Sequence, residues 1–135
     1  MEYRELGRSG VKVSALSLGT MTFGEQNSEA DGHAQMDYAV DRGINIFDAA
    51  EIYPVPPKPE TQGRTESIIG SWLASRKARD RVMVATKVIG RTKMNWLRKD
   101  GSPRAPEPRA NPGGGGGKPQ AAQYRLYRRL PASLA

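Results

Sequence analysis

The chain has no cysteine and only one histidine among its 135 residues. The lack of cysteine excludes a disulfide framework, a thiolate metal site and a cysteine nucleophile, and it fits a reducing compartment. No apolar run approaches the roughly 20 residues that span a bilayer, and the first ten residues, MEYRELGRSG, are charged. We therefore expect neither a signal peptide nor a transmembrane helix, and a cytoplasmic protein.

Acidic residues are almost missing from the last 35 residues, where Glu107 stands alone. The same stretch holds six Gly, six Pro and six Lys or Arg, so it carries +5 of the formal net charge of +7. It has no hydrophobic period before Tyr124, and the five glycines at 113–117 are typical of a flexible linker. We therefore expect one domain with a modest core over 1–100 and a disordered, low-complexity basic tail over 101–135.

Strand and helix signals alternate before residue 100. Two short runs around a glycine-bounded turn predict a hairpin, and three further short apolar runs predict buried strands separated by two helices. The order strand, helix, strand, helix, strand predicts an α/β fold with a parallel sheet and crossover helices. The hairpin is expected at 3–6 and 11–14, and the later strands at 16–18, 44–47 and 82–86.

The two predicted helices have clear signals. Ser28 and Asp31 form a capping-box pattern at the start of the first, and Gly43 can end it in the left-handed conformation. The second must follow the loop 51–63, because its four prolines oppose a helix there. The expected buried positions are Met36, Ala39 and Val40 in the first helix and Ile68, Ile69, Trp72 and Leu73 in the second.

Three ionisable residues lie at or near predicted strand ends: Asp48, Tyr53 and Lys87. Active sites of parallel α/β folds are built at that edge of the sheet. There, Lys87 would favour the ionised form of the Tyr53 hydroxyl, Asp48 would hold Lys87, and the tyrosine would serve as a general acid. The spacing by itself also fits a capping aspartate, a surface tyrosine and a lysine extended over the surface.

The segments around these residues resemble the aldo-keto reductase family, in particular its Tas-like bacterial members. The resemblance covers about residues 1 to 90, in the order and at the spacing of the family. The matching segments are Gly19-Thr20-Met21-Thr22-Phe23-Gly24, Asn45-Ile46-Phe47-Asp48-Ala49-Ala50-Glu51-Ile52-Tyr53, Thr65-Glu66 with Gly70, and Thr86-Lys87-Val88.

The resemblance implies a (β/α)8 TIM barrel with an N-terminal hairpin across its bottom. It also implies reduction of an aldehyde or ketone to an alcohol, with NADP(H) as hydride donor and a small carbonyl compound as substrate. By position, Asp48, Tyr53 and Lys87 match three of the four catalytic residues of the family. The nicotinamide-side loop of the family is matched by Gly19, Thr20 and Met21.

The fourth catalytic residue of the family is a histidine after the fourth strand, and it has no counterpart here. His33 belongs to the first predicted helix, where we expect it to be solvated and unable to replace the missing group. A family barrel needs about 250 residues, so we expect this chain to be an inactive N-terminal portion. Its open sheet edges predict aggregation or dependence on chaperones.

A shift of the reading frame would explain the tail. Synonymous codons for Gln123 to Ala135, read one base later, encode NTDYIDVYQLHW, which resembles the fourth strand and histidine motif of the family. GGN codons read one base later become GNG, so the run of glycines can hide codons for Glu, Ala or Val. We expect the shift between Lys87 and Arg104.

The alternative is a genuine basic tail that binds nucleic acid or an acidic membrane surface. Tyr124 and Tyr127 alternate with Arg125, Arg128 and Arg129, a pattern suited to stacking and phosphate contacts. Out-of-frame translation explains the same basic residues without any binding function. Retention on heparin or single-stranded DNA, compared with a chain that ends at residue 100, distinguishes the two.

Overall fold

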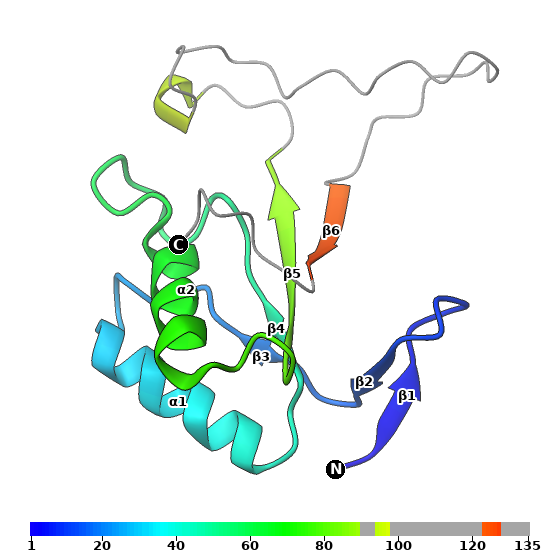
Figure 1. Cartoon of the computed structure of the whole chain (residues 1–135). Helices are drawn as coiled ribbons and strands as arrows, with labels where there is room; N and C mark the ends of the chain where they lie inside the picture. Colours follow the sequence, from blue (N-terminus) through cyan, green and yellow to red (C-terminus); the bar gives the residue numbers. More distant parts are fainter. Residues whose placement is uncertain (90–93, 98–122, 128–135) are drawn as a thin grey trace, which may run out of the picture.

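The computed structural model describes residues 1–89, 94–97 and 123–127, and Figure 1 shows their arrangement. These residues form six strands, two α-helices and one short 3-10 helix. In chain order they are β1 (Tyr3–Glu5), β2 (Lys12–Ser14), β3 (Leu18–Gly19), α1 (Glu29–Asp41), β4 (Ile46–Asp48), α2 (Arg64–Arg76), β5 (Met83–Val88), η1 (Asn95–Leu97) and β6 (Gln123–Tyr127).

Strands β1 and β2 form the predicted antiparallel hairpin, with Tyr3 opposite Ser14. Asn45, directly before β4, joins the hairpin to the sheet: its side-chain oxygen accepts from the Ser14 amide at 2.8 Å, and its side-chain nitrogen donates to the Lys12 carbonyl at 3.2 Å. The hairpin thus lies at the amino-terminal ends of the strands, opposite the edge where they end (Figure 1). This placement confirms the expected hairpin and its position at one end of the parallel strands.

Helix α1 begins and ends as its sequence predicts. Ser28 is the N-cap, and its side chain and that of Asp31 complete a capping box. After Asp41 the chain leaves the helix through Gly43 at φ 83°, a conformation that glycine adopts without a steric penalty. Neither α-helix in the described part of the chain is long and apolar enough to cross a membrane.

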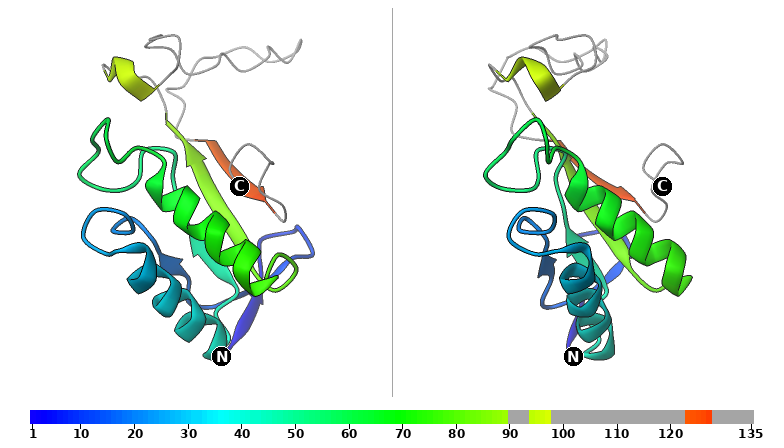
Figure 2. Two further views of the ribbon diagram at one scale, coloured as in Figure 1. Left: turned by 60° about the vertical axis from the view of Figure 1, so that its left-hand side comes forward. Right: turned by 90° about the vertical axis from the view of Figure 1, so that its left-hand side faces the viewer.

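Strands β3, β4 and β5 are parallel neighbours, with Phe47 paired to Leu18 on one side and Val84 on the other. Helices α1 and α2 connect them and lie together on one face of the sheet (Figure 2). The predicted alternation of strands and helices is therefore confirmed. Because all three strands run the same way, their carboxyl ends meet at one edge.

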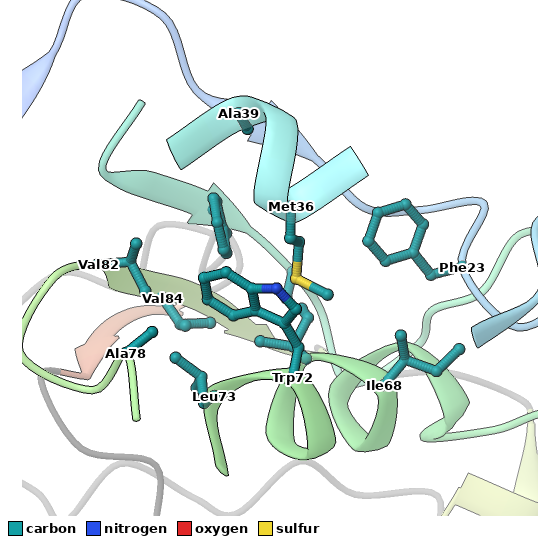
Figure 3. Close-up of a cluster of buried hydrophobic side chains, with 12 residues drawn as sticks. Phe23, Met36, Ala39, Ile68, Trp72, Leu73, Ala78, Val82 and Val84 are labelled. Carbon is teal, nitrogen blue, oxygen red and sulfur yellow. The ribbon is translucent and has the colours of Figure 1, made fainter. Parts of the chain in front are cut away.

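The core lies between this sheet and the two helices (Figure 3). Trp72 is 1% exposed and meets the edge of Phe47, with ring centroids 5.5 Å apart. Fully burying a large apolar side chain contributes about 1.5–3 kcal/mol, so this layer holds β4 and β5 against α2. The predicted core positions are buried except Val40, which is partly buried at the margin.

Strand β6 corrects part of the expected disorder over 101–135. It pairs antiparallel with β5, Leu126 opposite Ala85 and Tyr124 opposite Lys87. The physical reason is that an edge strand presents unpaired backbone donors and acceptors, which a segment containing Tyr and Leu can satisfy. The rest of the tail, and with it the remaining predictions for 101–122 and 128–135, lies outside the described residues.

Candidate active site

The site is built where β4 and β5 end. Asp48 is the last residue of β4 and pairs with Ala85, and Lys87 follows Ala85 by two positions. Side chains two residues apart on a strand share a face, so Lys87 rises on the same side as Asp48. Its Nζ donates to both carboxylate oxygens of Asp48, at 2.7 Å to Oδ1 and 2.6 Å to Oδ2.

The ion pair is partly shielded from water: the side chains of Lys87 and Asp48 are 18% and 36% exposed. Burial lowers the pKa of Lys87, but the hydrogen bond and charge of Asp48, with a contribution from Tyr53, act in the opposite direction and leave that pKa raised. Lys87 is therefore a fixed ammonium ion at neutral pH. It can donate hydrogen bonds and stabilise a neighbouring negative charge.

Tyr53 completes the group, in the loop that follows β4. Its amide donates to the Ala50 carbonyl at 3.0 Å, which folds the loop back toward the strand end. The Nζ of Lys87 lies 5.0 Å from the centroid of the Tyr53 ring, over its face, within the range of a cation–π interaction. The structure thus brings together the three residues that the sequence singles out, while their catalytic roles stay predictions.

The predicted cofactor loop follows β3, beside Asp48. Gly19 pairs with Asp48 and is exposed, and apart from its two chain neighbours no described residue has an atom within 4 Å of the place where a side chain would begin. Met21 is 49% exposed, and its carbonyl accepts from the Val55 amide at 2.9 Å. Gly19 and Met21 are therefore open to a ligand on the side of the sheet edge.

Thr20, between them, is fully buried. Its hydroxyl donates to the Asp48 carbonyl at 2.8 Å, and its amide donates to the same oxygen at 3.2 Å. Thr20 therefore fixes the backbone that carries Asp48. Its assignment to a cofactor loop stays a prediction. Because its side chain is buried, any contact with a cofactor would have to come from its main chain.

Sequence reasoning gave no role to two acidic residues that the structure places next to this site. Glu66, at the start of α2, is 8% exposed, and its Oε1 accepts from the Thr86 hydroxyl at 2.7 Å. Glu51 lies between Asp48 and Tyr53 and accepts from the Ile89 amide. Both belong to segments of the family resemblance, but spacing along the chain does not reveal contacts with a distant strand.

His33 corrects another expectation. It is only partly solvated: its side chain is 20% exposed, and its Nε2 lies 2.9 Å from Oγ of Ser71 on α2. The Ser71 hydroxyl also lies 2.5 Å from a carboxylate oxygen of Glu29. A helix histidine becomes half-buried when a second helix packs over it, and this contact joins residues 38 positions apart. His33 remains on α1, away from the strand ends, as predicted.

Comparisons with known proteins agree with this geometry. Residues 15–111 match the model of the aldo/keto reductase family. The chain is 58% identical over 95 residues to protein tas of Escherichia coli, covering 70% of this chain and 28% of that protein. It is 48% identical over 89 residues to the uncharacterized oxidoreductase YrpG of Bacillus subtilis, covering 65% and 26%.

Among solved structures, an aldo-keto reductase of Bacillus halodurans in its holo form superposes with a TM-score of 0.54 at 33% identity. The match covers 69% of this chain and 28% of that one. The chain therefore spans little more than a quarter of the length of the proteins it resembles. Strand β6 lies beyond the residues that the family model matches.

Proposed function

The chain belongs to the aldo/keto reductase family, and from this premise we propose that its strand-end site serves the NADP(H)-dependent reduction of an aldehyde or ketone to an alcohol. The described part is the amino-terminal portion of a (β/α)8 barrel: its hairpin, its first three barrel strands and two of its helices. Because the chain spans 28% of protein tas, the proposal concerns a protein in which this segment is joined to a full barrel.

The observation that carries the proposal is the contact of Lys87 with both Asp48 and Tyr53. A phenol with an ordinary pKa near 10 donates its proton poorly at neutral pH. The adjacent ammonium stabilises the phenolate that remains when Tyr53 gives its proton to the carbonyl oxygen of the substrate. Asp48 keeps Lys87 charged and aimed at the ring.

The cofactor is part of the proposal, and its dihydronicotinamide supplies the hydride that the carbonyl carbon receives. The open space at Gly19 and the exposed Met21 fit a flat ring placed beside the Asp48 strand end. Small residues allow a ligand to approach the backbone closely. The preference for NADP(H) over NAD(H) rests on the family resemblance.

Replacing Tyr53 by Phe in such a full-length reductase tests the proposal. We expect kcat to fall by about 10²- to 10⁴-fold, because a positioned general acid is lost. The affinity for NADPH, measured by fluorescence, should be nearly unchanged, since the hydroxyl acts on the carbonyl. Tyr38→Phe is the matched control, because Tyr38 is 62% exposed on α1. Full activity of the Tyr53→Phe enzyme would refute the assignment.

For the 135-residue chain by itself, we predict neither NADPH binding nor turnover. The family resemblance places the phosphate-binding loops after the last strands of the barrel, and without these loops the nicotinamide should be poorly held and the advantage of orientation, about 7–11 kcal/mol, forfeited. The nucleotide sequence tests the related proposal of a frame shift. A reductase frame that resumes before Arg104 without interruption would confirm it, and the absence of that frame would exclude it.

A further inference from the structure

Glu51 stands in the four-residue connection between Asp48 and Tyr53, and it contacts β5 and the residue that directly follows β5. Its amide donates to the Lys87 carbonyl at 2.9 Å. Its carboxylate oxygen Oε2 accepts from the Ile89 amide at 3.0 Å. One residue of the Tyr53 loop therefore bonds to the main chain at Lys87 and again at Ile89, two residues further along.

The second of these bonds extends the sheet beyond its regular end. The ladder between β4 and β5 continues into the loop through the Ala49 amide and the Ala85 carbonyl, at 2.8 Å, and then through the Glu51 amide. Strand β5 ends at Val88, so the next amide, that of Ile89, has left the ladder. The Glu51 carboxylate takes the place of the missing backbone acceptor.

The far side of the same loop is also anchored. The Tyr53 amide donates to Ala50, and the Val55 amide donates to the Met21 carbonyl. Glu51 precedes the donors of both bonds along the chain, and through it the loop bonds to the segment that carries Lys87. The distance from Lys87 Nζ to the Tyr53 ring therefore depends on where Glu51 holds that segment.

We propose that Glu51 is a positioning residue, whose carboxylate fixes the end of β5 so that Lys87 lies over Tyr53. The inference rests on the proposed function, because only the Tyr53–Lys87 contact gives the positioning a catalytic purpose. The effect of Glu51 passes through the main chain, at the Lys87 carbonyl and the Ile89 amide.

The test measures the Tyr53–Lys87 contact directly, in the full 135-residue chain carrying lysine labelled with ¹³C at Cε. The ring current of an aromatic side chain shifts methylene protons that lie above its face upfield in the NMR spectrum. The Lys87 signal is identified by its loss in Lys87→Arg, and Tyr53→Leu defines the shift without the ring. The variants are Glu51→Ala, Glu51→Asp and Glu51→Gln, with Glu60→Gln as control, since Glu60 is an exposed acid of the same loop.

We expect Glu51→Ala and Glu51→Asp to move the Lys87 signal toward its Tyr53→Leu position, because neither side chain reaches the Ile89 amide. Glu51→Gln should keep most of the upfield shift, since its amide oxygen still accepts a hydrogen bond. The control should match the unsubstituted chain. The indole signal of the buried Trp72 reports whether each variant is folded.

An unchanged Lys87 shift in folded Glu51→Ala would overturn the proposal. Loss of the fold in both Glu51→Ala and Glu51→Asp would overturn it as well, because Glu51 would then be a determinant of stability. If only Glu51→Ala unfolds, the Lys87 shift in Glu51→Asp tests the proposal, and an unchanged shift in that variant would overturn it.

A kinetic measurement in the full-length reductase provides a second test of the proposal. Misplacement of a reacting group by about 1 Å costs up to about 10²-fold, so Glu51→Asp should lower kcat by about 10- to 100-fold with little change in NADPH affinity. If that protein shows no reductase activity at all, the proposed function fails while the NMR result still decides the role of Glu51.

Discussion

Two polar clusters of this molecule contain the same kinds of groups, namely acids, cations and a hydroxyl. The strand-end cluster consists of Asp48, Tyr53 and Lys87, and the interhelix cluster consists of Glu29, His33, Asp37, Ser71 and Arg76. Serine, histidine and glutamate together are the parts of a nucleophilic triad. The comparison shows why only the strand-end cluster is a candidate active site.

The polar groups of the interhelix cluster bond to one another and hold α1 to α2. Ser71 bonds to Glu29 and His33, and Asp37 accepts from the Trp72 indole at 2.8 Å and from the Arg76 guanidinium at 2.8 Å. A triad requires the acid to orient the histidine from the nitrogen that does not face the serine. Here Glu29 lies 3.6 Å from Nε2, the same nitrogen that faces Ser71, so the arrangement is a structural contact.

The largest difference between the clusters should appear when the cation of each, Lys87 or Arg76, is replaced by the apolar side chain of methionine. In a full-length reductase, Lys87→Met should lower kcat by about 10²- to 10³-fold, because a preorganised electrostatic donor is lost. Arg76→Met should leave kcat unchanged, since Arg76 lies on α2 and contacts Asp37. Steady-state kinetics on both variants checks this, and equal losses would remove the distinction between the clusters.

The next effect concerns stability. Asp48→Asn leaves the half-buried Lys87 without its counter-charge, and we expect it to lower the free energy of unfolding by about 1–3 kcal/mol. Asp37→Asn should cost about 0–1 kcal/mol, because its partner Arg76 is solvent-exposed. Urea unfolding followed by Trp72 fluorescence measures both. A larger loss for Asp37→Asn would contradict the difference in burial.

The two clusters should also lose their contributions to stability at opposite ends of the pH scale. Because the pKa of Lys87 is raised above its ordinary 10.5, its contribution to stability is complete below that pH and is lost as pH rises through the folded value. The pKa of Asp37 is lowered from 3.8, by hydrogen bonds from Arg76 and then Trp72, so its contribution is lost as pH falls below that value.

Unfolding midpoints across pH test this directly. Lys87→Met should remove part of the alkaline decline and Asp37→Asn part of the acid decline, each without affecting the other limb. If either substitution flattens the opposite limb, the pKa directions have been assigned to the wrong contacts.

The smallest effect is expected for Ser71→Ala. One net hydrogen bond contributes about 1 kcal/mol, and partial solvation allows water to replace the hydroxyl, so the loss should be about 1 kcal/mol or less. Thermal unfolding of this variant beside Ser75→Ala, the next hydroxyl of the same helix, measures it. A loss of several kcal/mol would indicate that the interhelix cluster is a principal support of the fold.

The elements of the fold follow from local signals. The capping box at Ser28, the left-handed exit at Gly43 and the apolar face around Trp72 each depend on residues within one or two helical turns. Strand β6 was not predicted, because its pairing depends on the free edge of β5 rather than on its own periodicity. The contact of His33 with Ser71 was missed for the same reason: it exists only where two helices pack.

The amino-acid sequence by itself determined the alternation of strands and helices, the family, and which residues stand at the strand ends, because these depend on the order and spacing of neighbouring side chains. The sequence predicted that Lys87 would meet Asp48 and Tyr53, and the tertiary structure supplied these contacts. The tertiary structure alone decided that the pKa of Lys87 is raised, and that Thr20 and Glu51 bond to the main chain beside the site. Lys87 is 39 residues from Asp48 along the chain. A pairing over that separation is set by strand register and helix packing, which no local pattern contains.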